Sequence, residues 1–555
     1  MGDEAENVAV MLHETAARYP EQMAVAEPLG RDGNGRRIYR QVTFRELDQD
    51  STLLADGLRS LGARPGTRVA LLVRPGIDFI ALVFALFKAG VVVVLIDPGM
   101  GRRSLVRCLA EARPEGFVAI SLAHAVRVLL RRLFPLARFH VTVGRRWFWG
   151  GKTLRDLRAR RASDAAMWPA RATDPAAIIF TTGSTGPPKG VLYRHGQFTH
   201  QAIEIQRFYQ IQPGEIDLPA FPLFALFNCA MGVSTVIPDM NPTRPANVDP
   251  AKIVEAIDDW HVTQAFGSPA LWNVVGRYCE GRNIQLGSLR RVLSAGAPVP
   301  PHVLQRMKRA IHPAGDVHTP YGATEALPVA SISASEVLGE TARLTAIGHG
   351  TCVGRRFPGI DWKVIRIRDD AIAEIGQIEE LPVGQIGELM VRGPVVTDQY
   401  VTATHANALH KVRDGDSVWH RMGDLGYLDE SGRFWFCGRK SHRLLTETGP
   451  MYTIPCEAVF NQHPDVYRSA LVAVGPPGRQ TPVLVVEPWP DRMPKSRTQR
   501  RELTGQLRSI AQQHAHTRNI EHVLLHRSFP VDIRHNAKIF REKLAVWAAR
   551  RLGGG

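Results

Sequence analysis

The sequence predicts an α/β protein of two or more domains, with parallel-rich sheets flanked by helices. Strand and helix patterns alternate through roughly the first 350 residues, which is typical of parallel, doubly wound sheets. A chain of 555 residues exceeds one ordinary hydrophobic core, so more than one domain is expected. Its 44% hydrophobic and 22% charged residues are globular values, which argues against disorder and against a coiled coil.

Periodicity places the first alternating elements. Helices are expected around 11–19, over 43–61 and over 75–89, and strands over 68–73 and 91–96. The apolar run that ends at residue 96 is broken by Lys88 and Gly90, so it indicates a helix leading into a buried strand rather than a membrane span. The N-terminus lacks a signal pattern, and Glu6 breaks the myristoylation pattern, so a cytoplasmic protein is expected.

A loop rich in glycine and hydroxyl residues follows the apolar run 176–179, which is expected to be a buried strand. Gly183, Gly186 and Gly190 permit tight backbone turns, and such a loop can direct amide N–H groups and hydroxyls at phosphate oxygens. Lys189 adds a positive charge. The spacing differs from the Walker pattern, so the loop indicates another kind of phosphate site. The alternative is a surface turn with one solvated lysine.

Composition narrows the functional classes. Six cysteines without a Cys-x-x-Cys pair and 20 histidines without ligand spacing argue against a disulfide framework and a zinc site. The net charge is +16, and region 127–161 holds eleven basic residues against the single Asp156, with three aromatic residues at 147–149. This region is either an ordinary basic surface with its aromatics packed inward or a contact surface. No nucleic-acid-binding module accompanies it, so nucleic acid is not expected; contact with a membrane surface or a partner protein stays open.

Further segments follow the loop in order. The segment 291–298 is a strand ending in a small-residue turn, where a flat ring could approach the backbone; the alternative is a plain strand-to-helix turn. The segment 319–325 offers an aromatic ring, a hydroxyl and a carboxylate, although it could instead cap a helix. The segment 420–427 contains Asp424, which is suited to accept strong hydrogen bonds or is an exposed turn residue.

In this order the segments resemble the AMP-forming adenylating superfamily of acyl-CoA synthetases, adenylation domains and luciferases, over essentially the whole chain. The resemblance implies ATP as substrate and Mg²⁺ as metal ion. It implies catalytic roles for Lys538, Lys189, Thr324 and Glu325, with Glu325 and Thr185 holding the metal. The implied nucleotide contacts are Thr181, Thr182, Gly183, Ser184, Thr185, Gly186, Gly296, Ala297, Pro298, Tyr321, Gly322, Asp424 and Arg439.

The resemblance also implies the domain organisation. We expect an N-terminal adenylate-forming domain over 1–438, a hinge over 439–443 that contains Ser441, and a small mobile α+β lid domain over 444–555. Lys538 aligns with the family's catalytic lysine, which enters the site only when the small domain closes. A lysine on a lid can stabilise charge on the α-phosphate and the leaving pyrophosphate.

Longer stretches at 217–227, 236–245, 266–272 and 531–547 resemble one branch, the β-lactone synthetases of olefin biosynthesis. Ala225, Ser441-His442 and Ala537 depart from the general superfamily pattern in a way that fits this branch. The resemblance implies that a long-chain 2-alkyl-3-hydroxy acid is adenylated and that its own hydroxyl closes a β-lactone. Phe221, Phe224, Ala225 and Phe227 are the candidate alkyl pocket, although an apolar run is more often core.

Two alternatives remain open at this point. A long-chain acyl-CoA synthetase would share the adenylation step and use CoA as the nucleophile. An inactive scaffold could use the basic region to bind partners or a membrane. The expected partners are the long-chain hydroxy acid and the other enzymes of the olefin pathway (thiolase-like, reductase and hydrolase-fold decarboxylase). No general base is identified; His195 and His318 lie near nucleotide motifs, but either can be structural.

Overall fold

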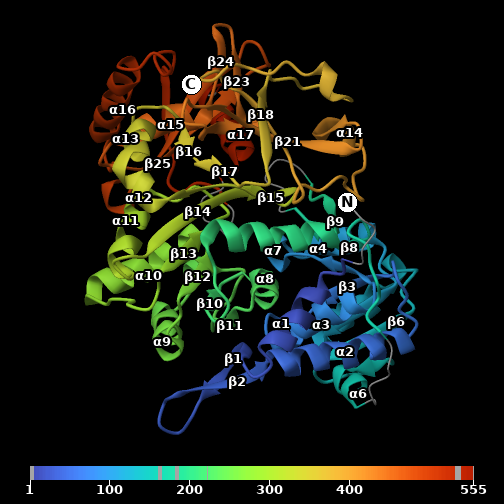
Figure 1. The fold of residues 1–555 in the computed structure, drawn as a ribbon. Coiled ribbons are helices and arrows are strands. Elements are labelled where there is room, and N and C mark those ends of the chain that lie inside the picture. The colour runs from blue at the N-terminus through green and yellow to red at the C-terminus, as the bar shows by residue number, and fades with distance from the viewer. Residues whose placement is uncertain (1–5, 160–165, 182–186, 222, 532–538, 554–555) are drawn as a thin grey trace.

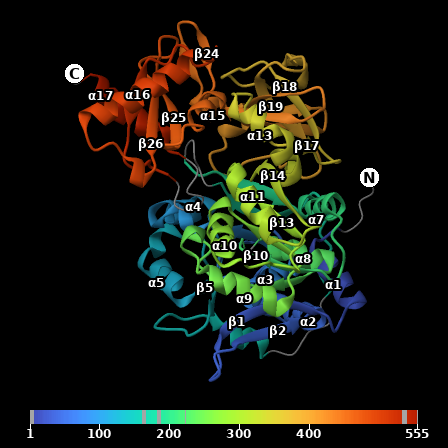
Figure 2. The ribbon, with the colours of Figure 1, turned by 90° about the vertical axis from the view of Figure 1, so that its left-hand side faces the viewer.

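The computed structural model describes residues 6–159, 166–181, 187–221, 223–531 and 539–553. Three large sheets form the part of the chain that precedes residue 440, and a smaller sheet with its own helices follows (Figure 1). The C-terminal part, red in Figure 2, lies beside the antiparallel sheet and above the two sheets of the N-terminal half. The predicted α/β class is therefore confirmed.

The first sheet has the strand order β7-β6-β5-β3-β4-β8-β9. All neighbouring pairs are parallel except β8 with β9. Its strands are β3 (Arg68–Leu72), β4 (Val92–Leu95), β5 (Gly116–Ile120), β6 (Phe139–Val143), β7 (Lys152–Thr153), β8 (Pro175–Phe180) and β9 (Gly190–Arg194). Because β8 and β9 form an antiparallel hairpin, the glycine-rich loop joins two neighbouring strands instead of opening a helix as a Walker loop does.

The second sheet has the order β17-β15-β14-β13-β12-β10-β11-β1-β2. It is parallel from β1 through β14, and β2, β15 and β17 pair antiparallel at its two ends. Its strands are β1 (Met23–Arg31), β2 (Arg37–Thr43), β10 (Ile216–Pro219), β11 (Ser234–Val236), β12 (Gln264–Gly267), β13 (Arg291–Ser294), β14 (Asp316–Ala323), β15 (Ala326–Ser333) and β17 (Arg355–Arg356). Segment 319–325 thus runs along a strand into a hairpin turn, and the alternative of a helix cap is wrong.

The third sheet is antiparallel, with the order β16-β22-β21-β19-β18 and with β20 paired to β21. Its strands are β16 (Thr351–Cys352), β18 (Asp361–Ile365), β19 (Gly387–Arg392), β20 (Lys411–Asp414), β21 (Ser417–Leu428) and β22 (Phe434–Arg439). Isolated bridges from Val191 to Tyr400 and from Ala326 to Val396 connect the segment after β19 to the first two sheets. All three sheets therefore meet around residues 396–400.

The helices cover the sheets in the order that alternation predicts. Helix α7 contacts both β9 and β15, so it joins the first two sheets (Figure 1). Helix α3 is buried along almost its whole length, as its apolar sequence requires. The helices before residue 440 are α1 (Ala9–Arg18), α2 (Phe44–Ser60), α3 (Ile77–Lys88), α4 (Arg102–Ala112), α5 (Ser121–Leu129), α6 (Leu154–Arg158), α7 (His195–Tyr209), α8 (Phe224–Met231), α9 (Pro250–Trp260), α10 (Pro269–Arg282), α11 (Pro301–Ala310), α12 (Ala334–Glu336), α13 (Ala342–Ala346) and α14 (Ala406–His410).

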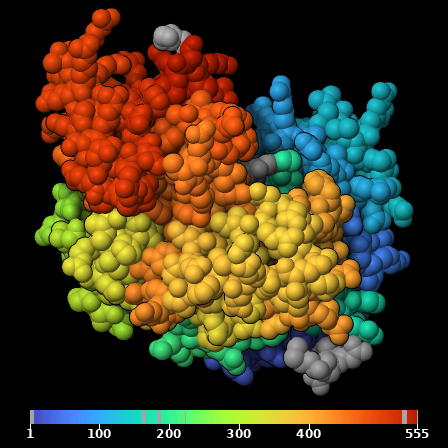
Figure 3. Space-filling view, turned by 90° about the horizontal axis from the view of Figure 1, so that it is seen from above, coloured from blue at the N-terminus to red at the C-terminus, as the bar shows by residue number. Residues whose placement is uncertain are grey.

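After residue 443 the chain forms the hairpin β23 (Leu444–Thr446) and β24 (Gly449–Met451) and then a separate sheet, β25-β26-β27. That sheet comprises β25 (Val466–Val474), β26 (Thr481–Pro488) and β27 (His522–Leu525), and its helices are α15 (Thr453–Phe460), α16 (Arg497–Gln512) and α17 (Arg541–Leu552). Helices α15 and α17 both contact β25, and separate apolar clusters fill the space on the two sides. Figure 3 shows this part, in red, as a distinct lobe. No helix among the described residues is long and apolar enough to cross a bilayer.

A buried carboxyl links β10 to α8. Asn228 donates from Nδ2 to Oδ2 of Asp217 at 2.7 Å and to Oγ1 of Thr235 at 3.0 Å, which fixes α8 on the second sheet. Asp217 is buried, and this burial raises its pKa to about 7. The native carboxyl binds a proton more tightly than the unfolded one, whose pKa is 3.8. Its contribution to stability is therefore present at low pH and is lost as the pH rises through 7.

We expect Asp217→Asn to remove this pH dependence. Between pH 5 and pH 8 the wild type should lose about 3 kcal/mol of unfolding free energy relative to the variant, because the buried carboxyl must ionise. Urea unfolding at the two pH values measures the difference. Exposed Asp416 supplies the matched control, and Asp416→Asn should follow the wild type. A parallel pH dependence in Asp217→Asn and wild type would contradict the assignment.

Candidate active site

Asp424 lies at the centre of a buried polar cluster. It is on β21 directly opposite Arg439 on β22, and Nη1 of Arg439 lies 3.0 Å from its Oδ1. Tyr321, on β14, donates from its hydroxyl to Oδ2 at 2.5 Å. Burial raises the pKa of Asp424, while Arg439 and the Tyr321 bond act in the opposite direction. The arrangement holds a carboxylate ready to accept hydrogen bonds, and the reading of Asp424 as an exposed turn residue is wrong.

A second cluster surrounds Tyr400. Its hydroxyl donates to Oε1 of Glu325 at 2.7 Å, and the Nζ of Lys189 lies 4.8 Å from its ring centroid. Lys189 also lies 3.2 Å from Nε2 of His410, and burial lowers the pKa of Lys189. The charge of Arg439 acts on both Lys189 and Glu325, so the two clusters form one electrostatic unit. An anion bound here would act in the opposite direction and raise the pKa of the lysine.

The turn after β13 lies at the same sheet edge. Strands β13 and β14 are parallel neighbours, so Gly296, Ala297 and Pro298 follow the carboxyl end of one strand beside Tyr321 on the other. Gly296 has a φ of +96°, which a side chain would strain. At Gly322 a Cβ would come within 2.7 Å of the carbonyl oxygen of Ala326, so only glycine fits the bulge between Tyr321 and Ala323.

The glycine-rich loop is described at its two ends. Thr181 donates its backbone N–H to the carbonyl of Lys189 at 3.0 Å, and the N–H of Lys189 donates to Oγ1 of Thr181 at 3.1 Å. This closes the loop against the hairpin and places Lys189 beside Glu325. Thr182, Gly183, Ser184, Thr185, Gly186 and Lys538 lie outside the described residues. Thr324 lies in the turn between β14 and β15, with its carbonyl accepting the hydroxyl of Tyr193.

The four residues of the candidate alkyl pocket differ in burial. Phe224 stacks on Phe266 at 3.7 Å between centroids and lies 6.0 Å from the ring of Phe221, and both Phe221 and Phe224 are half-buried. Ala225 and Phe227 are buried in the main core, where α8 packs against α1 and α7. Phe221 and Phe224 thus stay the accessible candidates for contact with an alkyl chain, while Ala225 and Phe227 support them from behind.

The predicted hinge contacts both parts of the chain. Ser441 is exposed in the short turn Lys440–His442. Lys440 forms an ion pair with Glu388 at 2.9 Å, on the third sheet, whereas His442 lies 3.2 Å from Glu542 on α17. Lys440 therefore contacts the third sheet, and His442, two residues later, contacts the C-terminal part of the chain.

The two histidines near nucleotide motifs are structural in their contacts. His195 is buried, and the backbone N–H of Val8 donates to its Nδ1 at 3.2 Å; burial lowers its pKa to about 4. His318 packs edge-on against Tyr209, and burial lowers its pKa as well. Neither histidine contacts the Asp424 or Tyr400 cluster in any described interaction.

Sequence reasoning missed three residues around the lysine. Tyr400, His410 and Lys411 join the site from the segment after β19, and burial lowers the pKa of Lys411 to about 8. A histidine at the end of the short helix α14 and a lysine at the start of β20 look like surface residues in the sequence.

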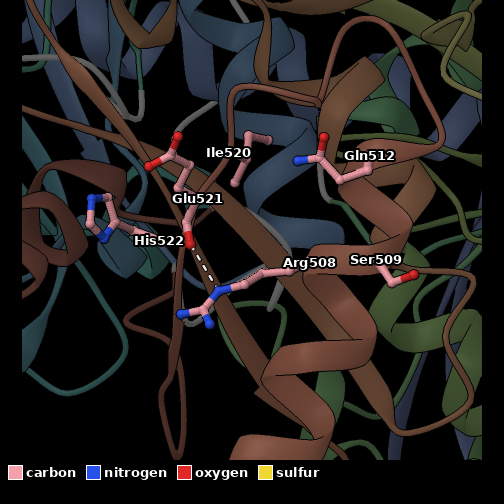
Figure 4. Close-up of a pocket in the computed structure, with 6 residues that line it drawn as sticks. All are labelled: Arg508, Ser509, Gln512, Ile520, Glu521 and His522. Atoms are coloured by element: carbon pink, nitrogen blue, oxygen red, sulfur yellow. Dashed lines mark hydrogen bonds between the residues drawn. The ribbon is translucent and has the colours of Figure 1, made fainter.

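Two pockets lie away from these clusters. One, of about 490 Å³, is formed by α16 and the segment before β27, where Arg508 donates from Nε to the carbonyl of Glu521 at 3.0 Å (Figure 4). The other, of about 520 Å³, lies between residues 347–349 and the hairpin after Thr448. None of the predicted site residues lines either pocket, so neither is the candidate active site.

The described residues are compatible with a Mg²⁺ ion that takes most of its ligands from substrate phosphates and water. They contain no group of three or more His, Cys, Asp or Glu side chains able to hold an ion. Glu325 offers a carboxylate oxygen at the site beside Lys189. Mg²⁺ is commonly bound by one or two carboxylates together with substrate phosphates and water, so this donor set is compatible with it.

The chain matches the AMP-binding enzyme family over residues 12–401, and it belongs to that family. It is 46% identical over 552 residues to a protein of Xanthomonas campestris pv. campestris named olefin beta-lactone synthetase, covering 98% of both chains. A protein of the same name from Stenotrophomonas maltophilia is 46% identical over 554 residues, again covering 98% of each. The resemblance to this branch is confirmed.

The solved structure of the amide bond synthetase McbA from Marinactinospora thermotolerans matches the fold with a TM-score of 0.78. The match covers 98% of this chain and 99% of that one at 22% sequence identity, so it supports the fold alone.

Proposed function

We propose that this protein uses ATP to convert a long-chain 2-alkyl-3-hydroxy fatty acid into a β-lactone. The observation that carries the proposal is the full-length identity of 46% to proteins named olefin beta-lactone synthetase. The nucleotide clusters support it, since they bring the predicted ribose carboxylate, the loop lysine and Glu325 into one electrostatic unit. Release of AMP and pyrophosphate follows from the proposed chemistry.

In the first step a carboxylate oxygen of the acid attacks the α-phosphorus of ATP, and pyrophosphate leaves. Asp424 accepts hydrogen bonds from the ribose hydroxyls, Tyr321 and the turn 296–298 hold the adenine, and Lys189 with Thr324 faces the phosphates. Glu325 and Thr185 would hold Mg²⁺, which would neutralise phosphate charge. Lys538, brought in by rotation about the 439–443 hinge, stabilises the charge that develops on the α-phosphate.

In the second step the substrate's own β-hydroxyl oxygen attacks the adenylated carbonyl carbon. The C–O bond to AMP breaks, AMP leaves with that electron pair, and the hydroxyl proton passes to a phosphate oxygen of the departing AMP. Because the nucleophile belongs to the same molecule, the protein chiefly holds the chain bent and excludes water. Half-buried Phe221 and Phe224 are suited to contact the bent alkyl chain.

The test supplies ATP, Mg²⁺ and a synthetic 2-alkyl-3-hydroxy acid, with and without CoA. We expect lactone and AMP without CoA, and no AMP formation by Lys538→Ala. Turnover that requires CoA and yields a thioester would instead identify an acyl-CoA synthetase. Equal consumption of an unsubstituted fatty acid would also contradict the proposal, because that acid carries no internal nucleophile.

A further inference from the structure

Helix α5 (Ser121–Leu129) presents an apolar stripe to solvent. Leu122, Val126 and Leu129 are spaced by four and three residues, so they lie on one helical face. They are 64%, 42% and 83% exposed, and Leu133, in the following turn Arg131–Leu133, is 45% exposed. Large apolar side chains exposed as a group, rather than singly, mark interaction surfaces.

The loop after β6 extends the same surface. Trp149 is buried, lies 5.6 Å from the ring of His124 on α5, and donates from Nε1 to Oγ1 of Thr142 at 2.9 Å. Trp147 and Phe148 are 50% and 74% exposed, so the alternative in which all three aromatics pack inward is wrong for these two. The hydroxyl of Ser121 donates to the carbonyl of Arg145, which ties the loop to the start of α5.

The surface is also strongly basic. Arg131, Arg132 and Arg145 are exposed, and none forms an ion pair with another described residue. Asp156 is the single acidic residue between 121 and 158, and it forms the capping box of α6: its carboxylate accepts the N–H of Thr153, and its own N–H donates to the Thr153 hydroxyl. Arg158, by contrast, turns inward to Asp50 and Asp78. An anionic partner is therefore the electrostatic complement of this surface.

We propose that this surface, called the α5 patch and formed by Leu122, Val126, Leu129, Leu133, Trp147 and Phe148 with Arg131, Arg132 and Arg145, docks on an anionic lipid bilayer. The apolar side chains enter the headgroup–acyl boundary, and the arginines bind lipid phosphates. Arginine is common in protein interfaces as well, but this patch contains arginines and no carboxylate, a charge of one sign that matches an anionic lipid surface. Here Arg131 and Arg132 stand between Leu129 and Leu133, an intermixing that suits a lipid interface, where long basic side chains reach headgroups beside inserted apolar ones.

Docking would place the enzyme where a long-chain amphiphile partitions, a consequence that rests on the proposed function. The docking itself does not depend on it, because it follows from exposure and charge. Binding can therefore be measured without any turnover, and failure of one proposal leaves the other standing.

The experiment is co-sedimentation of the full-length protein with vesicles of phosphatidylglycerol and phosphatidylethanolamine, or of phosphatidylcholine alone. We expect binding to the anionic vesicles that weakens as salt is raised. The double variant Arg131→Glu with Arg132→Glu should weaken binding to the anionic vesicles about 30-fold or more. The double variant Leu129→Ser with Phe148→Ser should weaken it about tenfold or more. Arg500→Glu with Arg501→Glu, an exposed adjacent pair on α16, makes the same charge change elsewhere and should bind like wild type.

Fluorescence supplies a second measurement. Brominated lipids should quench part of the tryptophan emission, and Trp147→Phe should remove that part. Melting temperatures and ATP–pyrophosphate exchange in the absence of vesicles should stay unchanged in the patch variants. Wild type that does not sediment, or control and patch variants that weaken binding equally, would overturn the proposal. Loss of a co-purifying protein without any vesicle binding would overturn it too and would identify the α5 patch as a protein interface.

Discussion

Asp424→Asn is expected to lower kcat/KM for ATP-dependent adenylation by about 100-fold. The carboxylate is held by the Tyr321 hydroxyl at 2.5 Å and by Arg439 at 3.0 Å. In the proposed complex it accepts hydrogen bonds from two ribose hydroxyls, and each charge-assisted bond contributes about 1.5 kcal/mol. Asparagine has the same shape but carries no charge and presents a donor to one of those hydroxyls. ATP–pyrophosphate exchange measures the loss.

A nucleotide series separates this role from a merely structural one. Wild type should discriminate against 2′-deoxy-ATP by about tenfold, the value of one such bond, whereas Asp424→Asn should hardly discriminate. The matched control is Asp429→Asn on the same β21–β22 hairpin, where Asp429 accepts from Arg433 and Trp435 away from the site. If wild type and Asp424→Asn discriminate equally between ATP and 2′-deoxy-ATP, Asp424 does not bind the ribose, whatever the effect on kcat.

Much of the fold follows from local patterns. The alternation that predicted parallel sheets is found in β3 through β8 and β10 through β14, and the helix expected over 43–61 is α2, whose capping box joins Thr43 and Glu46. The expected strand over 91–96 is β4, shorter by a residue at each end. Such patterns record burial along one segment, so they cannot show that the third sheet is antiparallel, which depends on pairing between segments distant in the sequence.

Only the residues of the candidate site that belong to sequence motifs can be predicted from the sequence. Lys189, Tyr321, Asp424 and Arg439 belong to recognisable strings, and the structure brings them together at the junction of three sheets. Tyr400 and Lys411 carry no such string. Tyr400 joins the site because isolated bridges draw residues 396–400 against β9 and β15, and Lys411 reaches it from β20 by donating to the carbonyl of Thr397. Both are tertiary contacts without local periodicity. The exposure of Phe148 was also beyond prediction, since an aromatic residue in a loop is buried or exposed according to what packs over it.

A buried charge cluster lies where the third sheet meets the predicted hinge. Glu388, on β19, is fully buried; Arg421 donates to it from Nη2 at 2.6 Å, and Lys440 donates from Nζ at 2.9 Å. Arg421 also donates to the carbonyl of Asp370 at 2.8 Å. Burial lowers the pKa of Lys440, and the carboxylate opposes that shift. One carboxylate thus neutralises two cations, of which the second is the residue next to Ser441.

Glu388→Ala is therefore expected to destabilise the protein by about 3–5 kcal/mol, because it leaves Arg421 charged, buried and without its counter-ion. Denaturant unfolding measures this, and limited proteolysis near residue 440 should show earlier cleavage, since Lys440 loses its anchor. The matched control is Glu379→Ala, which removes an exposed carboxylate paired with Arg366 at 2.6 Å and should cost about 1 kcal/mol or less. If the two variants lose equal stability, the cluster does not secure the hinge to the third sheet, and the rotation proposed for Lys538 must be anchored elsewhere.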